Sequence, residues 1–197
     1  QLNDFSTFLK FVYTWDFKKM IHCTHKKIAL FTGNQKGKTA GAAYQYVLRI
    51  LGMHPVPEKN VVYFECANNH KYAPNKTSAD GKCEQCGELL KQHERGSRTY
   101  RFCSETLPGQ SKDVDETGKS AEVKNTQYPE FKKWLPPFLI KADITIRNPA
   151  MTIKDPFGGA DIIVEFVSYN QAVQGTAGVQ RLSIWFDEEA PVDFYEE

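Results

Sequence analysis

The chain lacks any long hydrophobic run and carries almost no net charge. No apolar stretch reaches the roughly 20 residues that a membrane-spanning helix needs, and the first residues, Gln1 to Asp4, lack the basic segment and apolar core of a secretory signal. Lys and Arg (25) nearly balance Asp and Glu (24), so no overall field draws the chain to nucleic acid or to a membrane. We expect a soluble, cytosolic protein without a membrane partner, in which any DNA contact is a local patch.

A folded core is nevertheless expected, because 41% of the 197 residues are hydrophobic and 13% are aromatic. The chain begins without Met and stops at Glu197 just after a strand-like run, so we interpret it as a fragment of a longer protein. The five cysteines are an odd count, and Cys83 and Cys86 have a spacing that favours metal over a disulfide in a cytosolic chain.

The hydrophobic pattern alternates between strand and helix signals, which predicts an α/β fold with a mainly parallel sheet flanked by helices. Residues 27–32 form a short apolar run, residues 37–51 have apolar side chains on one helical face, and Gly52 is expected to end that helix. A second strand is expected at 60–65. Later elements are a helix ending near Trp134 and strands at 99–103, 143–148, 151–154, 161–168 and 182–186.

A phosphate-binding loop is predicted between the first strand and the first helix, the position that a Walker A loop requires. Glycines there let backbone N–H groups surround phosphate oxygens, and the helix N-terminus contributes its positive dipole end. Lys38 is expected to bridge the β- and γ-phosphates of ATP, and the Thr39 hydroxyl to ligate Mg²⁺. The loop is a variant, because Thr32 stands where the usual pattern has its first glycine. Its residues are Gly33, Asn34, Gln35, Lys36, Gly37, Lys38 and Thr39.

A second nucleotide motif is predicted at the end of the strand 182–186, where the apolar run stops at three carboxylates. Asp187 comes first and would hold Mg²⁺, while Glu188 would orient and deprotonate the attacking water. Glu189 is interpreted as a supporting neighbour. Acidic residues after a strand are often only a solvated turn, so this assignment depends on the loop at Lys38.

Residues 66–98 are polar and hold three of the five cysteines and two of the five histidines, and we interpret them as an insertion with its own metal site. Cys66 and His70 have three residues between them, Cys83 and Cys86 have two, and Gly87 follows as in zinc knuckles. Four such ligands suit tetrahedral Zn²⁺ with no open position, hence a structural site. The alternatives are that Cys103 or His93 replaces His70, or that no metal binds.

With both nucleotide motifs placed, residues 33–39 resemble the Gly-Asn-x-x-Gly-Lys-Thr loop of viral terminase large subunits, the ATPases that package DNA into capsids. Three further segments agree with this family: Leu135-Pro136 after a helix, 168–175 after a strand, and 184–191 at the acidic strand end. The chain departs from the family in carrying Gln35 and Lys36 where an Arg is common, and in its zinc insertion.

The resemblance implies a RecA-like P-loop ATPase domain over residues 1–197, with a nuclease domain of RNase H-like fold only beyond the end of the chain. It further implies double-stranded DNA as substrate, a homo-oligomeric ring on a portal protein, a small terminase subunit as partner, and a bacteriophage motor in the host cytoplasm that docks transiently on the procapsid. Arg181, or else Arg147, would be the arginine finger supplied to a neighbouring subunit.

Two other functions remain open on the sequence. One is a helicase or another RecA-like translocase. The other is a nucleotide-gated binding module whose zinc insertion contacts nucleic acid or protein. Glu188 argues against the module, because a switch needs no dedicated base.

Overall fold

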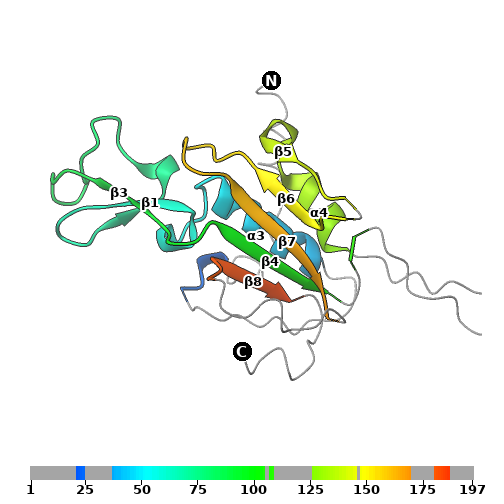
Figure 1. Ribbon diagram of the computed structural model, residues 1–197. Helices are drawn as coiled ribbons and strands as arrows, with labels where there is room; N and C mark the ends of the chain where they lie inside the picture. The colour runs from blue at the N-terminus through cyan, green and yellow to red at the C-terminus, as the bar shows by residue number, and fades with distance from the viewer. Residues whose placement is uncertain are drawn as a thin grey trace, which may run out of the picture. The chain divides into compact units, whose positions relative to one another are not determined.

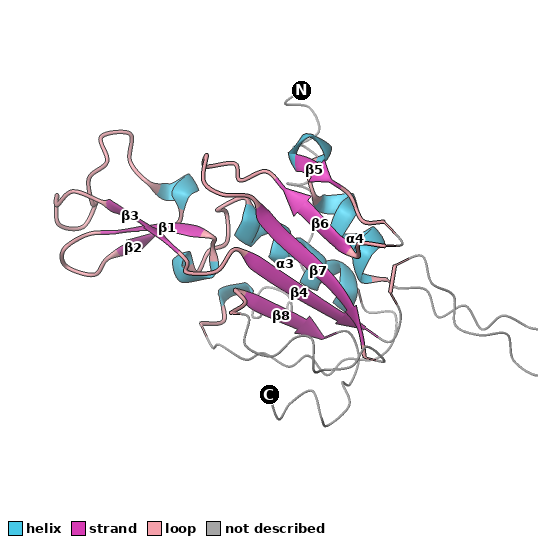
Figure 2. Cartoon of the chain, viewed as in Figure 1, coloured by secondary structure: helices cyan, strands magenta, loops and turns pink. Residues whose placement is uncertain are grey.

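The computed structural model describes residues 21–24, 37–104, 107–108, 126–145, 147–169 and 180–186 (Figures 1 and 2). The chain divides into two compact units, Gln1–Gly96 and Ser97–Glu197. The predicted metal ligands fall in the first unit and the acidic strand end in the second. Among the described helices, none is long and apolar enough to cross a bilayer.

The first unit contains helix α3 (Lys38–Ile50), which confirms the predicted helix. Gly37 precedes it in the left-handed conformation, with φ of 72°. The predicted apolar face is buried at its centre, but Gln45 and Arg49 are buried as well and bind each other through Arg49 Nη2 and Gln45 Oε1 at 2.8 Å. Gly52, with φ of 65°, ends the helix as expected, because a side chain there would oppose the left-handed turn.

A small antiparallel sheet follows α3 in the same unit, with the strand order β2-β1-β3. The strand predicted at 60–65 is present as β1, but it belongs to this separate sheet and not to the larger sheet of the second unit. Short 3-10 turns, η2 (Pro57–Lys59) and η3 (Pro74–Lys76), join the elements. The strands are β1 (Val62–Glu65), β2 (Lys71–Tyr72) and β3 (Lys91–Glu94).

The second unit is built on a five-stranded sheet with the order β5-β6-β7-β4-β8 (Figure 1). β4 runs parallel to both β7 and β8, whereas β6 pairs antiparallel with β5 and β7. The sheet is therefore mixed, not mainly parallel as predicted. Its strands are β4 (Thr99–Ser104), β5 (Ile140–Ala142), β6 (Ala150–Ile153), β7 (Ile162–Ser168) and β8 (Ser183–Phe186).

The strand predicted at 143–148 is wrong, because the described part of this segment connects β5 to β6 without forming a strand. β5 lies just before it, and the described part of 143–148 forms a turn closed by the backbone hydrogen bonds Thr145 N to Asn148 O (2.9 Å) and Asn148 N to Thr145 O (3.2 Å). Asp143 favours the turn, because its Oδ1 accepts the N–H of Ile144 at 2.9 Å. Residues 140–153 thus form a hairpin whose strands cannot both be parallel to β7.

Helix α4 (Gln127–Trp134) covers one face of this sheet and ends where the sequence predicted, before Leu135 and the 3-10 turn η4 (Pro137–Leu139). The core between them is aromatic. Phe102 of β4 meets Phe131 of α4, Phe166 of β7 and Trp185 of β8 edge-to-face, with ring centroids 5.1, 5.5 and 4.9 Å apart. Each such pair adds about 0.5–1.5 kcal/mol beyond the buried area, so α4, β7, β4 and β8 form one packed body.

Candidate metal centre and nucleotide site

Four side chains of the first unit meet at one point, as predicted. They are Cys66, His70, Cys83 and Cys86, and their ligand atoms all lie within 4.8 Å of one another. The two cysteines Cys66 and Cys83 are buried. Cys86 Sγ lies 3.6 Å from Cys66 Sγ, and Cys83 Sγ lies 3.4 Å from Nδ1 of His70. This cluster could hold a metal ion such as zinc.

Two tight turns bring the ligands together. The first follows β1: Cys66 N donates to His70 O (3.1 Å), Asn69 N donates to Cys66 O (3.0 Å), and Asn69 takes a positive φ of 61°. The second is the knuckle, where Gly87 N donates to Cys83 O (2.8 Å) with φ of 74° at the glycine. Each turn is local and joins one pair, so the spacing within Cys66–His70 and within Cys83–Cys86 specifies the two halves of the cluster.

The surroundings of the thiols favour a charged ligand set. Burial would raise the pKa of Cys83, but hydrogen bonds from Tyr72, from Cys86 and from the N–H groups of Gln85 and Cys86 lower it to about 6. A hydrogen bond from Asn68 lowers the pKa of Cys86, whereas burial raises the pKa of Cys66. Since the thiolate is the form that binds metal, the lowered pKa values of Cys83 and Cys86 favour a bound cation at this turn.

The spacing of the ligand atoms fits tetrahedral coordination. Zn–S bonds of about 2.3 Å place neighbouring sulfurs about 3.8 Å apart in a tetrahedron, and the Cys86–Cys66 separation is 3.6 Å. Neither predicted substitute for His70 joins the cluster. The ring of His93 stacks on Tyr63 with centroids 5.3 Å apart, and Cys103 is buried in β4 of the other unit, where burial raises its pKa to about 12.

The phosphate loop is described only at its end. Gly37, Lys38 and Thr39 lie where it enters α3, and the N–H of Gly41 donates to Gly37 O at 2.9 Å to close the first turn. Gly37 is exposed, and Lys38 and Thr39 are half-buried. Residues 33–36 lie outside the described residues. The described end has a glycine in the left-handed conformation followed by the start of a helix, and helix N-termini favour anions.

The acidic strand end is described up to its last apolar residue. β8 stops at Phe186, while Asp187 and Glu188 lie outside the described residues. Its backbone is fixed from two sides: β8 pairs with β4 in parallel, and the buried amide of Gln127 donates to the carbonyls of Cys103 (3.2 Å) and Trp185 (3.3 Å). Lys38 belongs to the first unit and the strand end before Asp187 to the second.

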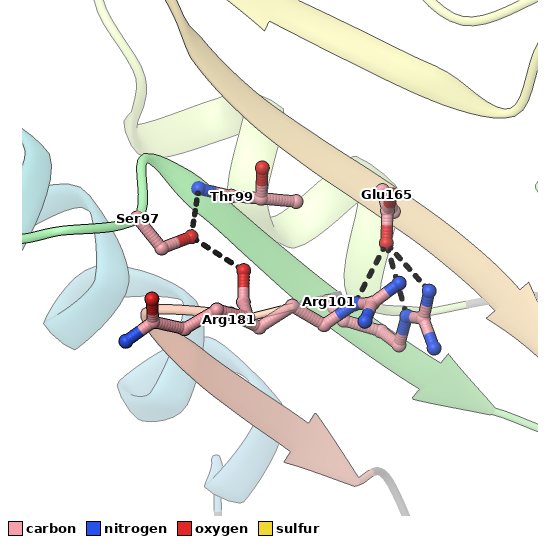
Figure 3. Close-up of polar contacts among 6 residues, drawn as sticks. Ser97, Thr99, Arg101, Glu165 and Arg181 are labelled. Carbon is pink, nitrogen blue, oxygen red and sulfur yellow. Dashed lines mark hydrogen bonds and ion pairs between the residues drawn. The ribbon is translucent and has the colours of Figure 1, made fainter. Parts of the chain in front are cut away.

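Arg181, predicted as an arginine finger, lies against a carboxylate of its own chain (Figure 3). Its Nε is 3.1 Å from Glu165 Oε2, and the same oxygen accepts from Nε and Nη2 of Arg101 at 3.0 and 2.8 Å. The second candidate finger, Arg147, is exposed in the segment that leads to β6.

Three contributors were missed by reasoning from the sequence. Tyr72 places its hydroxyl 3.2 Å from Cys83 Sγ, Gln127 joins two strand ends, and Glu165 joins two arginines. The sequence held a signal for only one of these contributors, because Arg101 and Glu165 are charged residues within otherwise apolar strands. Such residues predict buried ion pairs, but the pattern does not say which residue pairs with which.

No family model, no curated protein and no solved structure matches this chain. The assignment of the sites therefore depends on the residues and on their local geometry.

Proposed function

We propose that this chain is the ATPase part of a terminase-like DNA-packaging motor. The observation that carries the proposal is the pair of nucleotide motifs in the sequence, each attached to the element that it requires. A left-handed Gly37 leads into α3 at Lys38 and Thr39, and the parallel strand β8 ends immediately before Asp187 and Glu188. Ligands of parallel sheets bind at such strand ends.

Each residue has a distinct role in this proposal. Backbone N–H groups of residues 33–37 and the start of α3 bind phosphate oxygens, and Lys38 places a positive charge where negative charge develops. Thr39 and Asp187 would hold Mg²⁺, which supplies charge neutralisation at the phosphates when bound. Glu188 accepts the proton of the attacking water. A finger role for Arg181 toward a neighbouring subunit stays a prediction.

The larger setting is supported by the terminase resemblance alone. It comprises double-stranded DNA as the translocated substrate, a ring on a portal protein, a small terminase subunit, and action at the procapsid in the host cytoplasm. The alternatives are another RecA-like helicase or translocase and a nucleotide-gated binding module. Duplex DNA that accelerates ATP hydrolysis without strand separation distinguishes the motor from both.

Mutation of the two motifs tests the nucleotide site directly. Lys38→Ala should lower ATP turnover at least about a hundredfold, because it removes a preorganised charge from the phosphates. Glu188→Gln should bind ATP and hydrolyse it slowly, because the amide keeps the shape without the base. Lys76→Ala is the control, since Lys76 is exposed in η3 of the same unit as Lys38. Undiminished turnover in Lys38→Ala would reject the site.

We further propose that the cluster of three cysteines and one histidine binds a single structural Zn²⁺. Four protein ligands fill a tetrahedral shell and leave no position for substrate or water. The strands around it supply little core of their own, because every residue of β3 is exposed. The metal would therefore serve to fold this part of the chain.

A further inference from the structure

One carboxylate joins three neighbouring strands of the second unit (Figure 3). Glu165 lies in β7, Arg101 lies opposite it in β4, and Arg181 lies two residues before β8. Both guanidinium groups donate to the same oxygen, Oε2 of Glu165, at 2.8 to 3.1 Å. The side chains of Arg101 and Arg181 are only 10% and 8% exposed. Charged groups this buried are costly to separate.

The segment that enters β8 has two further anchors. Ser97 Oγ donates to Gln180 O at 2.7 Å, and Leu182 N donates to Thr99 O at 2.8 Å. The first of these is drawn in Figure 3 beside the ion pairs. Arg181, between them, reaches over β4 to Glu165. The start of β8 is thus tied to β7 as well as to its direct neighbour β4.

This tie matters because β8 is short. It has four residues and, within the described part of the chain, pairs with β4 alone. A slip by one residue would move the strand by about 3.3 Å and would exchange its two faces. Trp185 would then leave the aromatic core, and the residue after Phe186, which is Asp187, would move by the same distance.

We propose that Glu165 is a positioning residue for Asp187 and Glu188, acting through Arg101 and Arg181 to fix the register of β8. The inference depends on the proposed nucleotide site, in which those two carboxylates hold Mg²⁺ and activate water. It gives Arg181 a role within its own chain, different from that of a finger for a neighbouring subunit. A finger would have to leave Glu165 in order to act.

The two roles of Arg181 predict opposite effects of removing the carboxylate. Under the positioning role, Glu165→Gln weakens the contacts to both arginines and Arg181→Met removes one of them, so both variants cause the same kind of defect. The double variant is then no worse than the more affected single variant, since the two residues act through a shared contact. Under the finger role, Glu165→Gln releases the arginine, so turnover stays or rises while Arg181→Met abolishes it.

The experiment compares Glu165→Gln, Arg181→Met, their double variant and Arg181→Lys, which keeps the charge but loses the Nε donor. Asp161→Asn is the control, because its ion pair with Lys141 (2.6 Å) also lies in the second unit but is exposed. The first readout, independent of activity, is amide hydrogen exchange over residues 180–186. The second is the Mg²⁺ concentration that gives half-maximal ATP turnover, measured at several protein concentrations.

We expect Glu165→Gln and Arg181→Met to speed exchange at 180–186 and to raise the half-maximal Mg²⁺ concentration, each at least about fivefold. The effect should not depend on protein concentration, Arg181→Lys should be intermediate, and Asp161→Asn should match the wild type. Normal wild-type turnover together with unchanged exchange and Mg²⁺ dependence in Glu165→Gln overturns the inference alone. Absence of turnover in the wild-type chain rejects the nucleotide site, and the inference with it.

Discussion

The metal module, residues 62–94, and the sheet of the second unit differ in what fills their interiors. In the metal module the strands are short, all of β3 is exposed, and Leu89 is 66% exposed. Its centre is the four-ligand cluster. In the second unit, Phe102 and its aromatic partners fill the space between α4 and the sheet. One region thus has at its centre a Cys/His cluster that could hold a metal ion, and the other has an apolar core.

The difference determines which changes each region tolerates. Apolar packing is spread over many contacts, so the loss of one polar group leaves a fold that is weaker but intact. A four-ligand site is cooperative, because the metal binds only when the ligands are together. The metal module should therefore respond to metal and to its ligands in an all-or-none manner, and the sheet in graded steps.

Removal of metal should produce the largest effect and should separate the two regions. The wild-type chain should contain about one zinc, and Cys83→Ser should lower that content because it removes one ligand. Loss of zinc should unfold the metal module, because a structural zinc contributes roughly 10–16 kcal/mol to the folding of small domains. Amide exchange should become fast over 62–94 and stay slow in β4 and β7. Elemental analysis and exchange mass spectrometry measure the two effects.

Cys23→Ser is the matched control, since the thiol of Cys23 is half-buried but lies outside the cluster. It should retain the zinc. A metal-free wild-type chain in which 62–94 remains protected would remove the distinction between the two regions.

A smaller effect is expected from a buried ion pair in the sheet unit. Asp155, whose side chain is fully buried, binds Arg98 Nη1 at 2.6 Å and accepts the N–H groups of Phe157 and Gly159 at 2.9 Å. Asp155→Ala should lower the free energy of unfolding of this unit by about 3–5 kcal/mol, because it removes the buried carboxylate that pairs with the guanidinium of Arg98. Urea unfolding measures the change.

The exposed pair Lys141–Asp161, also 2.6 Å long, provides the comparison. Asp161→Ala should lower the free energy of unfolding by less than about 1 kcal/mol, since solvent screens that pair. Equal losses in both variants would show that burial does not set the cost in this sheet.

The sequence predicted the metal cluster better than the sheet. Each pair of ligands is close in the sequence and is joined by a local turn, so the spacing predicted both pairs, while Cys103 or His93 stayed open as a substitute for His70. The strands at 99–103, 151–154, 161–168 and 182–186 were also predicted to within about one or two residues. The antiparallel pairing of β6 with β7 was not, because it depends on the connection 154–161, which turns back at Asp155–Gly158 and is hidden from the apolar pattern. Glu165 was missed because its partners, Arg101 and Arg181, come from other parts of the sheet and are distant in the sequence.

Acidification should destabilise the first unit through one histidine. His54 is fully buried, its Nδ1 accepts the N–H of Val56 at 3.1 Å, and burial together with the charges of Arg49 and Lys59 lowers its pKa to about 3. As the pH falls below about 6.5, the unfolded chain binds a proton that the folded chain refuses. Stability is then lost at about 1.4 kcal/mol per pH unit until about pH 3.

The measurement is urea unfolding of zinc-loaded protein between pH 7 and 5, compared between variants so that effects of pH on the metal cancel. His54→Leu should flatten the dependence by about 1.4 kcal/mol per pH unit below pH 6.5. His93→Leu, at an exposed position, should leave it unchanged. An unchanged slope in His54→Leu would show that His54 does not set the acid sensitivity of this unit.

The smallest effect compares two glycines with the same backbone requirement, one in each region. Gly87 follows the knuckle with φ of 74°, Gly158 lies between β6 and β7 with φ of 82°, and an added Cβ would meet no atom within 4 Å at either position. Alanine therefore introduces only the strain of the left-handed conformation, about 1–2 kcal/mol.

In Gly158→Ala this strain should appear as a lower free energy of unfolding of the sheet unit. In Gly87→Ala it should appear instead as roughly fivefold to thirtyfold weaker zinc binding, because the metal folds that turn. Competition with a zinc chelator measures the second effect. Unchanged zinc affinity in Gly87→Ala would mean that the knuckle is already folded without metal.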